Sequence, residues 1–281
     1  MRSDAEIDTV YFLACEVGGS KYLFGDDQAS VQVRILRYNM QMYEVVWPWL
    51  LERGLPTVFV SSQLSNEHIP YGTVKRVGES WAEEHGNART VQLWNVYGIE
   101  KAGIKSHVVN DWVSSCLRHG NVTPRSNGFE SRQFLHTDEA AAAFVNMAEN
   151  WASVPQYVHL TTGKWTSLRE LATEMNAAFQ DEQLPACEFL WPETATTGNL
   201  QRRTPDLRSV FHADSELVAV RVANVLGKQV AAVSSADVQS VAESGKHHML
   251  GHLGLRQGLR RTIRQIRAQL KISINAYETE L

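Results

Sequence analysis

Cysteine is scarce in this sequence: its 281 residues include only Cys15, Cys116 and Cys187. The three lie far apart, and none has the spacing of metal ligands, so we expect no metal site. A sparse, odd-numbered set is typical of a protein that works in a reducing compartment. We therefore predict a cytoplasmic protein without a disulfide framework.

Long apolar runs and an excess of basic charge are also missing. No hydrophobic stretch approaches the length that spans a membrane, and residues 1–6 contain no apolar signal core. Lysine and arginine number 27 against 31 acidic residues, and the resulting net charge of −4 argues against a nucleic-acid-binding surface. We expect no membrane partner and no nucleic-acid partner.

The patterns that are present predict strands alternating with helices. Short apolar runs predict buried strands at 8–14, 58–62, 90–96 and 157–160. Apolar residues at helical spacing predict helices at 29–51, from 71 onward, and at 108–117, 140–147, 168–179 and 255–270. This alternation predicts an α/β fold with a Rossmann-like, doubly wound parallel sheet.

Several residues mark where these helices begin or end. Pro48 is expected to kink or end the first long helix. Asp138 is expected to cap the helix at 140–147, and Ser167 with Glu170 forms a capping box for the helix at 168–179. Residues 214–235 fit either a helix or a hairpin.

The candidate catalytic side chains lie at the end of the strand at 58–62 and at the start of the next helix. The strand ends on Ser61 and Ser62, and Tyr71 and Lys75 lie on one face of the helix because they are four residues apart. A phenol ordinarily titrates near pH ~10, and a neighbouring ammonium favours its phenolate form. This set can move a proton on or off a carbinol while a hydride moves elsewhere.

The order of motifs resembles the extended short-chain dehydrogenase/reductase family, which comprises NAD(P)-dependent nucleotide-sugar epimerases and dehydratases. The resemblance covers about residues 8–171, with a weaker match at Leu253–Leu259. It rests on five features. The first three are the strand at 8–14, the helix residue Asn39, and the Ser-Tyr-Lys set at Ser61–Lys75. The other two are the N-x-Y-G segment Asn95–Gly98 and the G-x-x-x-R-x-F motif Gly128–Phe134 with Asp138.

The resemblance implies roles for these residues. Tyr71 would be the acid/base, Lys75 would tune it and hold the nicotinamide ribose, and Ser62 or Ser61 would bind the sugar oxygen. Ala14 and Ser61 would lie beside the cofactor, which is NAD or NADP. Asn95 and Arg132 would hold the substrate diphosphate; otherwise Asn95 is a turn residue and Arg132 a surface ion-pair residue.

His107 and the loop after Ala14 resemble features of particular family members. Ser106-His107-Val108-Val109 is similar to a segment of GDP-fucose synthase that carries a catalytic histidine, and Cys15–Gly19 is similar to a loop of GDP-mannose 3,5-epimerase. His107 could protonate a ring carbon opposite Tyr71. The alternative is a partly buried histidine at the start of a helix. Gln63 and Leu64 stand where those epimerases have a reactive cysteine, which argues against 3,5-epimerisation.

Two family features are missing from the printed sequence. The glycine-rich turn that cradles a dinucleotide pyrophosphate is not found, so the strand at 8–14 is expected to form a bare apolar sheet edge. Three explanations stay open: an incomplete copy of a longer enzyme, an edge covered by 214–235 or by a partner, or a degenerate relative. The connection between Ser62 and Tyr71 is also shorter than the family's usual loop.

We therefore expect an NAD(P)-dependent nucleotide-sugar epimerase or dehydratase that passes through a keto-sugar. The alternatives are a non-catalytic relative that acts as a binding or assembly module, and an NADPH-dependent keto-sugar reductase. Residues 1–105 would form a partial dinucleotide-binding domain, and 106–281 a substrate lobe interleaved with returning Rossmann elements. The resemblance also implies a homodimer formed through the helices near 29–51 and 71–86.

Overall fold

The computed structural model describes residues 7–23, 27–101, 103, 105–192, 210–212 and 253–278. The chain divides into two compact units, each of which is discontinuous in sequence. Unit 1 contains Met1–Trp94, Ala140–Thr162 and Pro205–Leu250. Unit 2 contains Asn95–Glu139, Gly163–Thr204 and Gly251–Leu281. Each unit has its own hydrophobic core.

Unit 1 is built on a five-stranded parallel sheet, which confirms the predicted α/β fold. Its strand order is β1-β2-β3-β8-β11, with β1 at Val10–Phe12, β2 at Thr57–Ser62, β3 at Ala88–Leu93, β8 at Tyr157–Thr161 and β11 at Val210–His212. Strand β2, which lies between β1 and β3, is an apolar, β-branched run that is buried almost throughout, as expected for a strand covered on both faces. Its register pairs Phe59 with Phe12 on one side and with Thr90 on the other.

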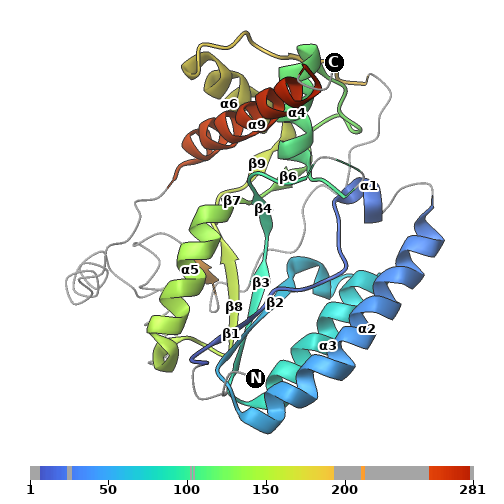
Figure 1. The fold of residues 1–281 in the computed structure, drawn as a ribbon, viewed down its shortest axis with the longest axis vertical. Helices are drawn as coiled ribbons and strands as arrows, with labels where there is room; N and C mark the ends of the chain where they lie inside the picture. Colours follow the sequence, from blue (N-terminus) through green and yellow to red (C-terminus); the bar gives the residue numbers. More distant parts are fainter. Residues whose placement is uncertain are drawn as a thin grey trace. The chain divides into compact units, whose positions relative to one another are not determined.

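Helices cover both faces of this sheet (Figure 1). The helical segments of unit 1 are α1 (Ser20–Leu23), α2 (Gln28–Arg53), η2 (Gln63–Asn66), α3 (Pro70–His85), η3 (Trp151–Ser153), and the part of α5 (Thr137–Glu149) from Ala140 onward. Phe12 packs edge-on against Tyr43 and Trp47 of α2, whereas neighbouring Tyr11 contacts Phe144 of α5. Because successive strand residues face opposite sides of a sheet, α2 and α5 lie on opposite faces.

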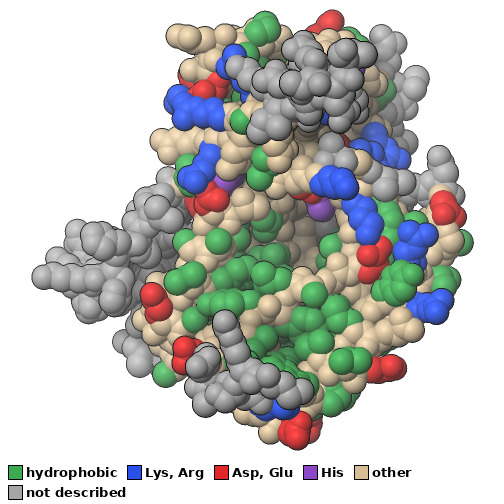
Figure 2. Space-filling view, viewed as in Figure 1, with side chains coloured by type: hydrophobic (Ala, Val, Ile, Leu, Met, Phe, Trp, Pro, Cys, Tyr) green, Lys and Arg blue, Asp and Glu red, His purple; other side chains and the backbone are tan. Residues whose placement is uncertain are grey.

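Strand β1 forms one edge of the sheet within the described part of the chain, as the sequence predicts. Tyr11 and Leu13 leave 38% and 53% of their surface exposed there. On α5, Val145 is also exposed. Figure 2 shows hydrophobic side chains gathered over the sheet and α5 of this unit. The edge therefore combines unpaired backbone groups with an apolar surface.

One of the two alternatives predicted for Pro48, a helix end, is wrong, and so is the predicted cap at Asp138. Pro48 lies inside α2 and does not end it; the helix stops at Gly54, which adopts a left-handed conformation (φ 58°) and donates to Leu50 O at 2.9 Å. The apolar face of α2 around Trp47 and Leu50 is fully buried, so packing continues the helix past the proline. Asp138 lies within the first turn of α5, which already begins at Thr137, so Asp138 is not the residue that precedes the helix.

Close packing between α3 and β2 depends on a glycine. A methyl group on Gly78 would lie 2.1 Å from Phe59 Cζ and 2.8 Å from the Tyr43 hydroxyl oxygen. Gly78 therefore lets α3 approach the strand whose end carries Ser61 and Ser62.

The described part of unit 2 combines helices with pairs of short strands. Its elements are β4 (Asn95–Tyr97), α4 (Val108–His119), β5 (Asn121–Val122), β6 (Ser131–Arg132), β7 (Phe134–His136), β9 (Thr166–Ser167), α6 (Leu168–Asp181), β10 (Glu188–Phe189) and α9 (Leu255–Glu278). Strand β4 pairs with β7, β5 with β10, and β6 with β9. Helices α4, α6 and α9 enclose the core, which includes Leu171, Met175 and Ile263. The predicted capping box is confirmed: the Ser167 hydroxyl accepts from the Glu170 N–H at 3.1 Å.

The cysteine prediction is wrong in unit 2, because Cys116 and Cys187 form a disulfide. The two residues are separated by 71 positions in sequence, so spacing alone gave no sign of the pair. They meet because α4 ends beside β5, and β5 pairs with β10 next to Cys187. Both side chains are buried, and Cys15 is the free cysteine.

Residues 214–235, for which the sequence allowed a helix or a hairpin, lie outside the described residues. Among the described helices, none has both the length and the apolar character that a membrane crossing requires.

Candidate active site

Tyr71 and Lys75 lie on the first turns of α3 in unit 1, and α3 packs against β2, whose carboxyl end carries Ser62. Helix α3 begins with Pro70, whose missing N–H leaves no helical hydrogen bond unmade at that position. The short 3₁₀ helix η2 fills the connection between Ser62 and α3. Tyr71 and Lys75 therefore start α3 directly beside the strand end, as predicted.

Lys75 is buried at the centre of this arrangement, with 3% of its surface exposed. Its ammonium donates a hydrogen bond to Val60 O at 2.7 Å. The same nitrogen lies 5.7 Å from the centroid of the Tyr71 ring and 5.6 Å from that of Phe59. The carbonyl and the two ring faces together offset part of the cost of burying the charge.

Tyr71 is almost enclosed, with 6% of its surface exposed. Its ring belongs to the apolar cluster of unit 1, which also contains Phe12, Tyr43, Phe59 and Val74. The ring is thus held rigidly beside Lys75. A reacting group has only a narrow approach to it in this conformation.

The two serines of the strand end face different partners. Ser61 is buried, and its hydroxyl donates to a carboxylate oxygen of Glu79 on α3. Ser62 is half-buried, and its hydroxyl accepts the N–H of Leu64 at 3.2 Å. Because accepting that bond leaves the Ser62 hydrogen available, Ser62 can donate to a substrate oxygen, whereas Ser61 already donates to Glu79.

Cys15 and Tyr43 complete the surroundings of Lys75. Burial raises the pKa of the Cys15 thiol, and the neighbouring Lys75 ammonium lowers it in part. Burial also raises the pKa of Tyr43, whose hydroxyl has no hydrogen-bond partner among the described residues. Both groups are therefore neutral near pH 7, and Lys75 is the cation beside Tyr71.

The donors at this strand end suit one part of a nicotinamide cofactor. An ammonium and two hydroxyl groups can hold the hydroxyls of a ribose or carbinol, and Ala14, at the end of the neighbouring strand, is exposed. This fit concerns the nicotinamide end of the cofactor.

Asn95 and Arg132 lie close together in unit 2. The Asn95 N–H donates to Gln133 O at 3.2 Å, which places Asn95 next to the residue that follows Arg132. Arg132 is half-buried and donates to Ser131 O at 2.7 Å. Burial lowers the pKa of its guanidinium, and Glu130 counters that effect. An arginine that keeps its charge while half-buried is suited to an oxyanion, although the roles of both residues stay predictions.

His107 is the residue that precedes α4 in unit 2. Its Nδ1 lies 2.9 Å from a carboxylate oxygen of Glu100, and 46% of its side chain is exposed. The hydrogen bond with Glu100 raises the pKa of His107, and Asp111 adds to this effect. The partly exposed, ion-paired position at a helix start matches the simpler of the two predicted alternatives, and a catalytic role stays a prediction.

Glu79 is the residue of this site that sequence reasoning missed. It accepts hydrogen bonds from Ser61 and from Gln92 Nε2, the latter at 3.2 Å. A signal was present, because Glu79 follows Lys75 by four residues and so continues the helix face of Tyr71 and Lys75. The contact of Cys15 with Lys75 had no comparable signal, since it depends on how the loop after β1 folds.

Comparison with known proteins agrees with this arrangement. Residues 3–163 match the model of the NAD-dependent epimerase/dehydratase family. The chain belongs to this family. The match includes the whole Ser-Tyr-Lys set together with Asn95, His107 and Arg132. No curated protein matches the sequence at a significant level.

Solved structures with the same fold include several members of this kind. A UDP-glucose 4-epimerase from Thermotoga maritima, determined with UDP-glucose, has a TM-score of 0.57 at 17% identity over 94% of this chain and 78% of its own. An epimerase from Methanothermobacter thermautotrophicus gives 0.65 at 14% identity over 95% and 74%. A GDP-L-fucose synthetase from Naegleria fowleri bound to NADP gives 0.63 at 13% identity over 94% and 78%. At these identities, the similarity shows the Rossmann-like epimerase fold.

Proposed function

We propose that this family member is an NAD(P)-dependent epimerase or dehydratase of nucleotide sugars, with Tyr71 as its acid/base. The observation that carries the proposal is the pairing of Tyr71 with buried Lys75, 5.7 Å from the ring centroid to the ammonium, at the end of β2. Burying an ammonium is costly, so such a pair contributes little as a structural contact. It is suited to proton exchange with a carbinol.

In the proposed reaction, each residue of the set handles one atom of the substrate carbinol. Ser62 donates a hydrogen bond to the carbinol oxygen and fixes its position. The Tyr71 oxygen takes the hydroxyl proton, and the positive charge of Lys75 stabilises the phenolate that accepts it. A bound nicotinamide supplies the hydride acceptor, so a keto-sugar results. Glu79 accepts a hydrogen bond from Ser61 and so fixes the end of β2 against α3.

The remaining parts of the chain have roles in substrate and partner binding under this proposal. Unit 1 would bind the cofactor, and Asn95 and Arg132 of unit 2 would hold the substrate diphosphate. The exposed apolar residues of α2, Val33, Tyr38 and Val45, support a homodimer formed through the helices near 29–51 and 71–86. A cytoplasmic location stays a prediction, and the disulfide Cys116–Cys187 weighs against it.

The test is binding and turnover with the purified full chain. Quenching of the intrinsic tryptophan fluorescence by NAD and by NADP measures cofactor binding and distinguishes the two. A panel of UDP-, GDP- and dTDP-hexoses is then analysed for epimerised or dehydrated products. We expect saturable binding of one cofactor and conversion of at least one sugar. Absence of cofactor binding would contradict the proposal.

One observation favours a second candidate, a non-catalytic relative that acts as a binding or assembly module. Tyr71 exposes 6% of its surface and packs within an apolar cluster, which suits a structural tyrosine. In that case the chain binds nucleotide sugar without oxidising it, and replacing Tyr71 by phenylalanine leaves all binding unchanged. A third candidate, an NADPH-dependent keto-sugar reductase, is supported by the protonated state that Glu100 favours in His107.

A further inference from the structure

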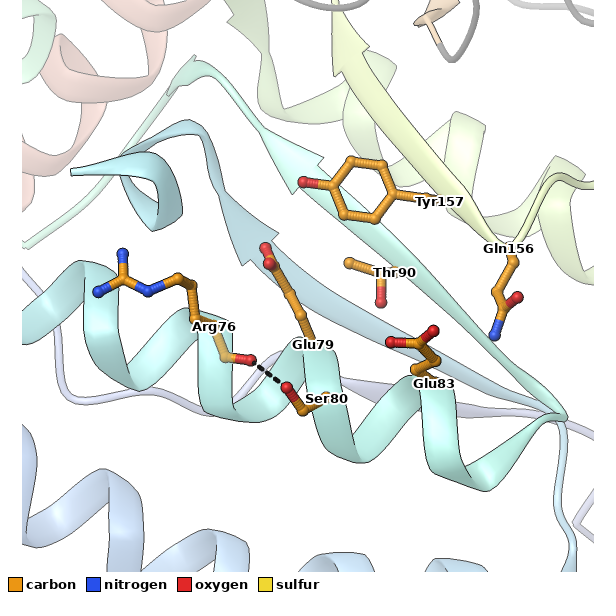
Figure 3. Close-up of a pocket in the computed structure, with 7 residues that line it drawn as sticks. All are labelled: Arg76, Glu79, Ser80, Glu83, Thr90, Gln156 and Tyr157. Atoms are coloured by element: carbon orange, nitrogen blue, oxygen red, sulfur yellow. Dashed lines mark hydrogen bonds between the residues drawn. The ribbon is translucent and has the colours of Figure 1, made fainter. Parts of the chain in front are cut away.

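A cavity of about 400 Å³ lies in unit 1 between α3 and the strands β3 and β8. Its walls include Glu79 and Glu83 from α3, Thr90 from β3, and Gln156 and Tyr157 at the start of β8 (Figure 3). Thr90 pairs with Tyr157 in the sheet register. Both lie in the amino-terminal half of their strands, whereas Ser62 ends β2 at the opposite, carboxyl end. The cavity therefore lies toward the other end of the strands from Ser62, although it shares Glu79 with the candidate active site.

The charge of the lining favours a cation. Glu79 and Glu83 are one helical turn apart, so their carboxylates lie on the same face of α3. Within the described part of the chain, neither forms an ion pair. The one basic residue of the lining, Arg76, donates to the carbonyls of Ser65 and Glu67, the latter at 3.0 Å. Its guanidinium is directed to these carbonyls and, among the described residues, forms no ion pair with either carboxylate. The two carboxylates and this guanidinium leave the lining with one net negative charge.

The hydroxyl of Thr90 offers a hydrogen-bonding group to a ligand in this cavity. Thr90 lines the cavity, yet only 4% of its surface is exposed. Its backbone N–H donates to Gln156 O at 2.7 Å, but its hydroxyl has no hydrogen-bond partner among the described residues. The hydroxyl oxygen is not one of the fully buried atoms, so it reaches the cavity and can accept a hydrogen bond from a ligand that carries a donor.

The shape and chemistry of the lining favour an organic cation over a metal ion. The described residues contain no group of three or more His, Cys, Asp or Glu side chains that could hold a metal. The volume exceeds that of an ion, and the Tyr157 ring offers a face for an ammonium or its methylene chain. Two carboxylates four residues apart, about 6 Å along the helix axis, match the two ends of a short aliphatic diamine.

We propose that this cavity binds a small aliphatic di- or polyamine, held by Glu79 and Glu83 with Thr90 as an additional acceptor. The proposal does not rest on the redox function, because it uses neither the cofactor nor the side chains of Ser62, Tyr71 and Lys75. Glu79 belongs to both sites, since its carboxylate also accepts from Ser61.

Isothermal titration of the full chain with putrescine, at about 0.15 M salt to screen non-specific attraction, tests this site. We expect saturable binding, weaker binding of butylamine, and none of 1,4-butanediol, which has the same length without charge. Replacing the exposed Glu83 (Glu83→Gln) should weaken putrescine about two- to fivefold. Replacing Thr90 (Thr90→Val) keeps the β-branched shape and should weaken it about two- to tenfold.

Glu84→Gln is the matched control, because Glu84 is exposed on the same helix and does not line the cavity. It should leave putrescine binding unchanged. The proposal is overturned if putrescine does not bind saturably, if Glu84→Gln weakens binding as much as Glu83→Gln, or if magnesium competes as well as a diamine does. Since no nicotinamide or sugar is present, none of these outcomes bears on the proposed enzymatic function.

Discussion

The ammonium of Lys75 lies one helical turn from Tyr71, 5.7 Å from the centroid of its ring, and donates to Val60 O at 2.7 Å. The helix that carries both residues is thereby fixed to the strand that ends on Ser61 and Ser62. A cation buried to this degree would be a poor choice for stability alone. Its position beside the phenol is the feature that most favours a chemical role.

Replacing this lysine by methionine (Lys75→Met) should separate the chemical role from the structural one. Methionine keeps an unbranched apolar stem against Phe59 and Tyr71 and removes the buried charge, so the melting temperature should change little. Turnover should fall by about 10²-fold or more, because the phenolate loses its counter-charge. Lys101→Met, an exposed position, is the control for the loss of a charge. Normal turnover in Lys75→Met would remove the lysine from the mechanism.

Gly78 should resist even the smallest substitution. Alanine ordinarily favours a helix over glycine by about 1 kcal/mol, but here its methyl group would lie 2.1 Å from Phe59 Cζ. Gly78→Ala should therefore lower the free energy of unfolding by about 1–3 kcal/mol, measured by urea denaturation. The exposed Ser80→Ala on the same helix should change it by less than about 0.5 kcal/mol. A stabilised Gly78→Ala protein would show that α3 does not approach β2 so closely.

The disulfide between Cys116 and Cys187 should stabilise unit 2 considerably. It closes a loop of 71 residues, and in the chain-entropy account a loop of this length contributes about 4 kcal/mol. Reduction, or the paired substitution of both cysteines by serine, should lower the melting temperature. Alkylation of the unfolded, non-reduced protein followed by intact mass measurement should find one free thiol, that of Cys15. Three alkylated thiols would contradict the bond.

The His107–Glu100 pair should make a small, pH-dependent contribution to stability. The pKa of His107 is raised above its ordinary 6.5, chiefly by the hydrogen bond to Glu100. A raised pKa means that the folded state binds the proton more tightly, so the contribution is complete below pH 6.5 and is lost as the pH rises through the folded-state value.

Because 46% of the His107 side chain is exposed, the effect should stay below about 1 kcal/mol. His107→Asn should therefore be less stable than the parent at about pH 5.5 and equal to it at about pH 8.5. His119→Asn, at an exposed position, is the control. An NMR titration that finds the His107 pKa below 6.5 would contradict the ion pair.

The sequence predicted the elements of this fold well where their signals are local. The run at 58–62, the four-residue spacing of Tyr71 and Lys75, and the capping box at Ser167 each depend on neighbouring residues, and each is confirmed. The predicted helix end at Pro48 is wrong, because burial of the apolar face of α2 outweighs the hydrogen bond that one proline cannot make.

The features that could not be predicted depend on contacts between distant residues. The disulfide joins positions 71 residues apart, and its formation depends on the pairing of β5 with β10. The partner of Ser61 is likewise set by tertiary packing, since Glu79 reaches it across the α3–β2 contact. The near-complete burial of Tyr71 follows from the aromatic cluster around Phe59, which no local pattern specifies.

The central claim is that the Tyr71 oxygen exchanges a proton with a sugar carbinol. The most direct measurement mixes the full chain and its preferred oxidised cofactor with each nucleotide hexose and follows the absorbance of reduced nicotinamide. In a single turnover, the parent protein should show a transient rise of reduced cofactor with at least one sugar, before the hydride returns to the sugar. Tyr71→Phe keeps the buried ring and loses only the hydroxyl. This variant should bind the oxidised cofactor normally, yet it should form the reduced cofactor at least about 10²-fold more slowly. Equal rates of reduction in the two proteins would contradict the account.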